Sequence, residues 1–181
     1  MDSGLHQDFR YLDTDEDRQQ LVSDIRHVRQ QVIQMAESIP PEQQYEPRYH
    51  GWSLAAMLAH LDTIDGLALT GIKLALIGLR PPISLAMLNG FNDMTARIYQ
   101  RRVVTTTIKG IQRTEKRIDD LIMTLPMDRF TREVYHPPSA SYLTVERALQ
   151  QYFLFHWHEH LQTMQRERGI YYEPPQSSAE M

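Results

Sequence analysis

The amino-acid sequence predicts an all-α fold, namely a four-helix bundle, and three observations lead to this prediction. Apolar residues recur every three or four positions in four long stretches, prolines and glycines separate these stretches, and none of them alternates apolar and polar residues as a strand does. The 181 residues, 41% hydrophobic and 23% charged, are enough to form one core. We therefore expect a single domain over residues 1–181, with a globular part at about 15–170 and irregular tails.

Two helices are predicted in the first half of the chain. The first covers about residues 15–38, and its acidic first turn suits the positive end of the helix dipole. The second covers about residues 53–79, and a proline pair follows each helix, at positions 40–41 and 81–82. Their apolar stripes are Leu21, Ile25, Val28, Val32, Met35 and Ile39 in the first helix, and Leu54, Leu58, Leu61, Ile64, Ala68, Ile72 and Ala75 in the second. Each helix therefore offers one apolar face to a shared core.

The third helical pattern is long, from about residue 84 to residue 125, and we expect a kink or a break in it. The β-branched run at residues 103–107 weakens the helix and offers a threonine as a new N-cap. The segment at residues 127–141 contains two prolines and two serines, which predicts a loop. A short extended stretch is expected within this loop, at residues 130–135.

The fourth helix is predicted at about residues 144–169, with Thr144 as its N-cap and Gly169 just beyond its end. Three or four positions separate its core-facing residues, which are Val145, Leu149, Tyr152, His156, His160 and Thr163. The aromatic residues of this helix are expected to make core or dimer contacts, and they are Phe153, Phe155 and Trp157.

Histidines mark the candidate functional site. His156 and His160 are one turn apart and differ by about 40° around the helix axis, so that one ion can bind both, whereas His158 is rotated by about 200° from His156. Two imidazoles in an apolar stripe need partners for their nitrogens, and a metal ion is one such partner. A chance spacing among eight histidines is the alternative. His60 flanks the stripe of the second helix and can face the pair, although a lone histidine there is more often an ordinary core residue.

The composition argues against several other kinds of site and location. Because the chain has no cysteine, any metal must be held by imidazole and carboxylate groups. A formal net charge of −4 argues against a nucleic-acid partner, since binding to phosphates favours a basic surface. The most apolar stretch, at residues 67–79, is too short to cross a membrane, and the N-terminus has no apolar signal segment. We therefore expect a cytoplasmic protein with no nucleic-acid or membrane partner.

The sequence resembles the DinB-like superfamily of DNA-damage-inducible proteins, which includes YfiT-type metalloenzymes and low-molecular-weight-thiol transferases. Three motifs carry the resemblance in the right order, and they are Gly-Trp-Ser at residues 51–53, Leu-Ala-His-Leu at residues 58–61 and His-x-x-x-His at residues 156–160. An Asn-Gly-Phe-Asn run at residues 89–92 is similar to a segment of some members. The resemblance covers about residues 21–169, which is nearly the whole globular part.

This resemblance implies a metal site and an assembly. By it, His60, His156 and His160 are the ligands of one divalent metal ion, in a four-helix bundle that forms a homodimer. Thr163 stands where many members have glutamine. This difference does not affect the three ligands, but it prevents assignment to a subfamily. Because the superfamily is functionally diverse, the resemblance says more about the site than about the reaction.

Three imidazoles suit zinc or nickel, with iron as a further option. Since three protein ligands leave a coordination position open, we expect an enzyme that acts on a small molecule. It is either a transferase in which a low-molecular-weight thiol supplies a metal-bound thiolate, which the resemblance favours, or a hydrolase that uses metal-bound hydroxide. The alternative is a non-catalytic, metal-stabilised dimeric module for binding or stress response.

Further candidates lie around the histidines. Glu159 precedes His160 and is the candidate general base, or it orients an imidazole, although an exposed helix glutamate is the simpler interpretation. Asp62 and Asp65 follow His60 on the second helix and are expected to face solvent. The residues that can line the open side of the metal are Asn92, Asp93, Tyr135 and His136.

Overall fold

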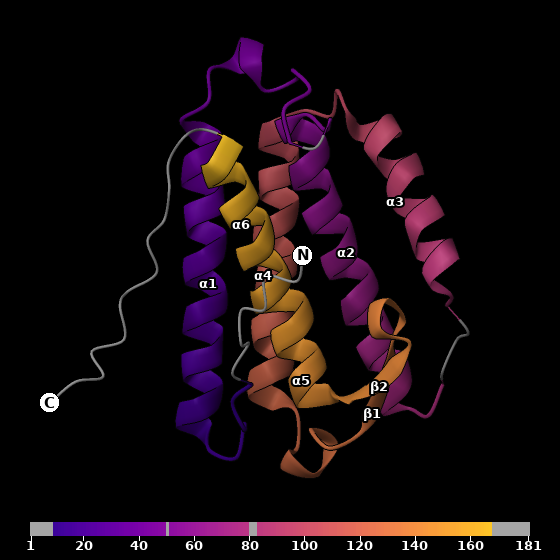
Figure 1. Cartoon of the computed structure of the whole chain (residues 1–181). Helices are drawn as coiled ribbons and strands as arrows, with labels where there is room; N and C mark the ends of the chain where they lie inside the picture. The colour runs from indigo at the N-terminus through magenta and orange to yellow at the C-terminus, as the bar shows by residue number, and fades with distance from the viewer. Residues whose placement is uncertain (1–8, 50, 80–82, 168–181) are drawn as a thin grey trace, which may run out of the picture.

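The computed structural model describes residues 9–49, 51–79 and 83–167, and within them it confirms the predicted all-α bundle. Four helical rods form the bundle, and a fifth helix, α3, packs on the outer side of α2 (Figure 1). The elements are α1 (Asp15–Glu37), α2 (Leu54–Leu76), α3 (Leu85–Tyr99), α4 (Val104–Thr124) and a last rod made of α5 (Val145–Gln150), the π-helical segment η4 (Gln151–Phe155) and α6 (His156–Glu167). Among the described helices, none combines the length and the apolar character of a membrane-spanning segment.

The long third helical pattern is broken, as expected, into two helices, α3 and α4, and the break lies at residues 100–103, slightly before the β-branched run. The N-cap of α4 is Val103, which makes no side-chain cap hydrogen bond, so the predicted threonine cap is wrong. The break lets the chain leave the outer side of α2 and enter the bundle, where α4 packs against both α1 and α2. As α3 carries the chain back along the molecule, α2 and α4 run in the same direction (Figure 1).

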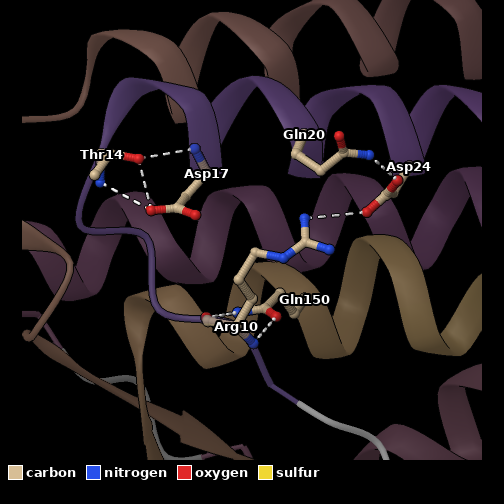
Figure 2. A network of polar contacts seen from close by, with 6 residues as sticks. All are labelled: Arg10, Thr14, Asp17, Gln20, Asp24 and Gln150. Carbon is tan, nitrogen blue, oxygen red and sulfur yellow. Dashed lines mark hydrogen bonds and ion pairs between the residues drawn. The ribbon is translucent and has the colours of Figure 1, made fainter. Parts of the chain in front are cut away.

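Both ends of the first helix are close to those predicted, and its N-terminus is fixed by two sets of hydrogen bonds (Figure 2). Thr14 and Asp17 form a reciprocal capping box, in which each side chain accepts a hydrogen bond from the other residue's backbone N–H. Arg10 pairs through its backbone N–H and carbonyl with the Gln150 amide, at 2.7 and 2.8 Å. These bonds attach the segment before α1 to the end of α5.

The predicted loop at residues 127–141 contains a β-hairpin. Its antiparallel strands are β1 (Glu133–His136) and β2 (Ser141–Thr144), with Ala140 in the left-handed region at φ 48° between them. Strands of four residues are too short for an alternating pattern to stand out in the sequence. The expected extended stretch overlaps β1, whereas β2 was not predicted. The hairpin packs against α2 and α5.

The last rod begins as predicted, with the Thr144 side chain accepting a hydrogen bond from the backbone N–H of Arg147. Gly169 and the C-terminal tail lie outside the described residues. The segment η4 was not predicted. It interrupts the α-helix directly before His156, whose N–H bonds to the Gln151 carbonyl, five residues earlier.

A buried ion pair crosses the core. The guanidinium of Arg29 on α1 donates to Asp65 of α2 at 2.7 Å, and both side chains are 0% exposed. The indole N–H of Trp157 on α6 donates to the other Asp65 oxygen at 3.0 Å, while the Arg29 guanidinium lies 4.4 Å from the centre of the Trp157 ring. The expectation that Asp65 faces solvent is therefore wrong. Trp157 and Phe153 lie in the core, as predicted. Burial raises the pKa of Asp65, and Arg29 and Trp157 act against this rise.

Replacing Asp65 with Ala is expected to lower the free energy of unfolding by about 3–5 kcal/mol, because it leaves the Arg29 charge buried and unpaired. Urea unfolding followed by circular dichroism measures this loss. Asp120→Ala is the control, since Asp120 pairs with Lys116 on the exposed surface of α4 and its loss is expected to cost only about 0.3–0.5 kcal/mol. Equal losses in the two variants would contradict the role given to the buried pair.

Candidate metal centre

Two helices bring three imidazoles together. His60 lies in the second turn of α2, and His156 and His160 lie one turn apart at the start of α6. The Nε2 atom of His156 is 3.3 Å from that of His60 and 3.0 Å from that of His160. One ring nitrogen of each residue lies within 4.8 Å of the other two, which is a group that can hold a metal ion. The structure thus brings the three predicted ligands to one point, and their role as ligands remains a prediction.

The spacing of these nitrogens fits a tetrahedral metal ion. Two nitrogens that are each about 2.05 Å from a tetrahedral zinc ion lie about 3.3 Å apart. The two Nε2 separations given above are 3.3 and 3.0 Å, so only small shifts are needed to admit an ion.

The environment keeps His60 and His156 neutral, which is the form of imidazole that binds a metal. Burial lowers the pKa of His60 to about 3, and the proximity of His160 adds to this effect. Burial also lowers the pKa of His156 well below its usual value, with further contributions from His160, His60 and Arg29. At neutral pH, therefore, His60 and His156 are uncharged and each has a nitrogen lone pair for a ligand.

The surroundings of the imidazoles hold them in place. The Trp52 ring, just before α2, meets the His60 ring edge-on at a centroid distance of 5.1 Å. Arg29 donates a hydrogen bond of 2.8 Å to the backbone carbonyl of Phe153, inside the π-helical segment that precedes His156. The Nδ1 atoms of His60 and His156 are buried and have no hydrogen-bond partner among the described residues. Their position is thus set by packing and by the backbone rather than by a carboxylate on the second nitrogen.

A cavity of about 550 Å³ opens beside the histidines, and His60, His156 and Glu159 all contribute to its lining. Glu159 is largely exposed, so it lies on the solvent side of this cavity. Of the four residues expected near the open side of the metal, three line the cavity and Asp93 does not; the three are Asn92, Tyr135 and His136.

Other lining groups have altered pKa values. Burial lowers the pKa of His136, whose Nδ1 is 2.7 Å from the Ser139 hydroxyl. Burial raises the pKa of Tyr152 to about 12. Both side chains are therefore neutral at physiological pH, and they provide hydrogen bonds rather than charge.

Arg29 and Asp65 are supporting residues that sequence reasoning missed. Asp65 occupies a core position in α2, seven residues before Ile72, and Arg29 lies four residues after Ile25 in α1. Opposite charges at core positions of two predicted helices are a signal that could have identified them, because such charges are buried only in pairs. For η4 the sequence offers no comparable signal.

Comparison with known proteins identifies relatives of this fold. A model of the DinB superfamily matches residues 13–164. YfiT from Bacillus subtilis, described as a probable metal-dependent hydrolase with an unusual four-helix bundle topology, is 22% identical, with a TM-score of 0.71 over 90% of this chain and 93% of YfiT. A protein from Streptococcus pneumoniae is 14% identical, with a TM-score of 0.70 over 91% of this chain and 95% of its own. No curated protein sequence matches the chain.

The prediction that nucleic acid is not a partner is contradicted by a protein of similar structure. The colibactin self-resistance protein ClbS was crystallised in complex with double-stranded DNA, and it is 15% identical to this chain, with a TM-score of 0.70 over 90% of this chain and all of ClbS. A protein of the same fold therefore binds DNA. An acidic net charge describes the whole surface and not a local one, so it was too coarse an argument.

Because the Nε2 atoms face one another, added zinc is expected to fix His60, His156 and His160 as the tautomer protonated on Nδ1. Long-range ¹H–¹⁵N correlation spectra of the imidazoles report the tautomer. The exposed His158 on the same helix is the control, and its signals are expected to stay unchanged. Zinc-induced signals from an Nδ1-coordinated ring among the three would contradict the geometry.

Proposed function

We propose that this chain, which belongs to the DinB superfamily, is a metal-dependent hydrolase that acts on a small molecule. The observation that carries the proposal is the convergence of His60, His156 and His160 beside a cavity. Its volume of about 550 Å³ suits a small molecule, because such sites measure about 300–1,000 Å³. Hydrolysis as the reaction is supported by the likeness to YfiT, a probable metal-dependent hydrolase.

The side chains of the site have distinct tasks in this proposal. A divalent ion held by the three imidazoles would act as a Lewis acid with an open position and would lower the pKa of a water molecule that binds to it. The Glu159 carboxylate lines the same cavity as His60 and His156 and would accept the proton of the attacking water. Apolar side chains on the cavity wall limit the access of bulk water, which strengthens electrostatic interactions within the site.

The three imidazole nitrogens limit which metal ion the site can prefer. Three imidazole nitrogens suit zinc or nickel, and also iron, whereas magnesium and calcium prefer oxygen ligands. We propose zinc or nickel as the resident ion. Neutral imidazoles favour such binding at physiological pH.

Thiol transfer is a second candidate, and the absence of cysteine favours it in one respect, since a sulfur nucleophile would then come from a co-substrate. Against it, none of the described lining residues is a lysine or an arginine that could pair with the carboxylates of many small biological thiols. We therefore place hydrolysis first. If the protein converts a substrate only when a low-molecular-weight thiol such as cysteamine is added, thiol transfer would replace hydrolysis as the first candidate.

Metal analysis of protein purified without an affinity tag tests the site itself. We expect about one transition-metal ion per chain in the wild type and its loss in His156→Ala, with the same result for His60→Ala and His160→Ala. His158→Ala is the matched control on the same helix and is expected to keep the ion. Equal, sub-stoichiometric metal in all proteins would remove the basis for a metal-dependent reaction. A non-catalytic, metal-stabilised module is the alternative, and in that case loss of the ion would lower the melting temperature strongly.

Glu159→Gln is expected to retain the metal and to lower kcat for the hydrolysis of a p-nitrophenyl ester by about 10²–10⁴-fold, because the amide cannot accept a proton. The rate of p-nitrophenol release by the metal-loaded protein measures this loss. Glu167→Gln, an exposed change near the end of the same helix and away from the cavity, is the control. An unchanged kcat in Glu159→Gln would assign the proton transfer to another group.

Two questions about partners accompany this proposal. The homodimer expected from the sequence remains a prediction, and light scattering on the purified protein tests it. Since ClbS was crystallised with double-stranded DNA, nucleic acid belongs among the ligands to be tested. Fluorescence anisotropy of a labelled duplex, with the metal-loaded protein, measures such binding directly.

A further inference from the structure

The cavity beside the histidines has a floor of small side chains. Ile64, Ala68, Gly71 and Ala75 lie on one face of α2 at helical spacing, and all four line the cavity. A Cβ atom added at Gly71 would meet no other atom within 4 Å, so the space above this glycine is open. The floor thus extends along α2 from His60 for about four turns.

The cavity walls are apolar as well. They include Leu74 of α2, Leu79 beyond its end, Ile83 before α3, Leu85 and Leu88 of α3, and Val134 of β1. Among the described lining residues, Glu159 is the only one with a formal charge at neutral pH. A phosphate or carboxylate on this part of a ligand would therefore find no cation in the described lining, whereas a hydrocarbon group would gain from burial.

We propose that this cavity binds an extended, uncharged apolar group of the substrate, such as an alkyl chain or an aryl group, and places the reacting bond at the histidines. This inference rests on the proposed metal-dependent function, and it adds the chemical class of the substrate. The occupant is the substrate because the open floor is continuous with His60 and His156 at one end. The described part of the lining favours an uncharged body over a charged one.

The cavity is tested with 1-alkanols from butanol to octanol, added to the full-length protein and followed by calorimetry. Affinity is expected to rise about fourfold for each added methylene, as expected for transfer of the chain out of water. Gly71→Leu is expected to weaken octanol binding by about tenfold or more, because the new side chain occupies the same space. Gly66→Leu is the matched control, since Gly66 is also a glycine of α2 with open space around it but does not line the cavity.

The link between the cavity and the metal is tested with hydroxamates, which chelate metal ions, on zinc-loaded protein. Octanohydroxamate is expected to bind much more tightly than acetohydroxamate to the wild type and to Gly66→Leu, and this preference is expected to disappear in Gly71→Leu. Acetohydroxamate binding without a chain-length preference would overturn the present inference and leave the proposed function intact.

Failure of both hydroxamates to bind, with alkanol binding that depends on Gly71, would contradict the metal site and confirm the apolar cavity. Alkanol affinities that do not respond to chain length or to Gly71→Leu would overturn the inference whatever the metal content. With metal-free protein, tighter binding of octanoate than of octanol would also overturn it, because the described lining then offers a carboxylate no partner.

Discussion

The buried contact between Arg29, Asp65 and Trp157 is the constraint on which the arrangement of the helices depends. It joins α1, α2 and α6, so the two helices that carry the histidines are fixed to a common third helix. A guanidinium and a carboxylate without solvent are tolerated only when each satisfies the other, and this requirement admits few relative positions of the helices. The bond from Arg29 to the carbonyl of Phe153 extends the constraint to the backbone beside His156.

Periodicity alone predicted most of the helices, and it placed His60, His156 and His160 on faces that turn inward, because a core-facing stripe also specifies direction. The β-branched run at residues 103–107 also indicated the break between α3 and α4, whereas periodicity failed in strands of four residues. It also assigned Asp65 to solvent, since a charge is usually exposed, and only the position of its partner in three dimensions reveals the exception.

The candidate centre combines a cluster of three histidines with a mostly apolar cavity beside it. Burial keeps His60 and His156 neutral, and the cavity beside them is lined mostly by apolar side chains. Membership of the DinB superfamily accounts for the bundle. The chemistry is a property of the side chains that surround the histidines, and members of one fold can differ in it.

The π-helical segment η4 has a consequence for how such a site is gained or lost. It accommodates one residue more than an α-helix of the same length, so regular α-helical winding of the same residues would rotate everything beyond it by about 100°. His156 and His160 would then turn together, away from His60 on its separate helix. A homologue could thus retain every histidine of the motif and yet have no centre, which makes the winding of this segment as diagnostic as the ligands themselves.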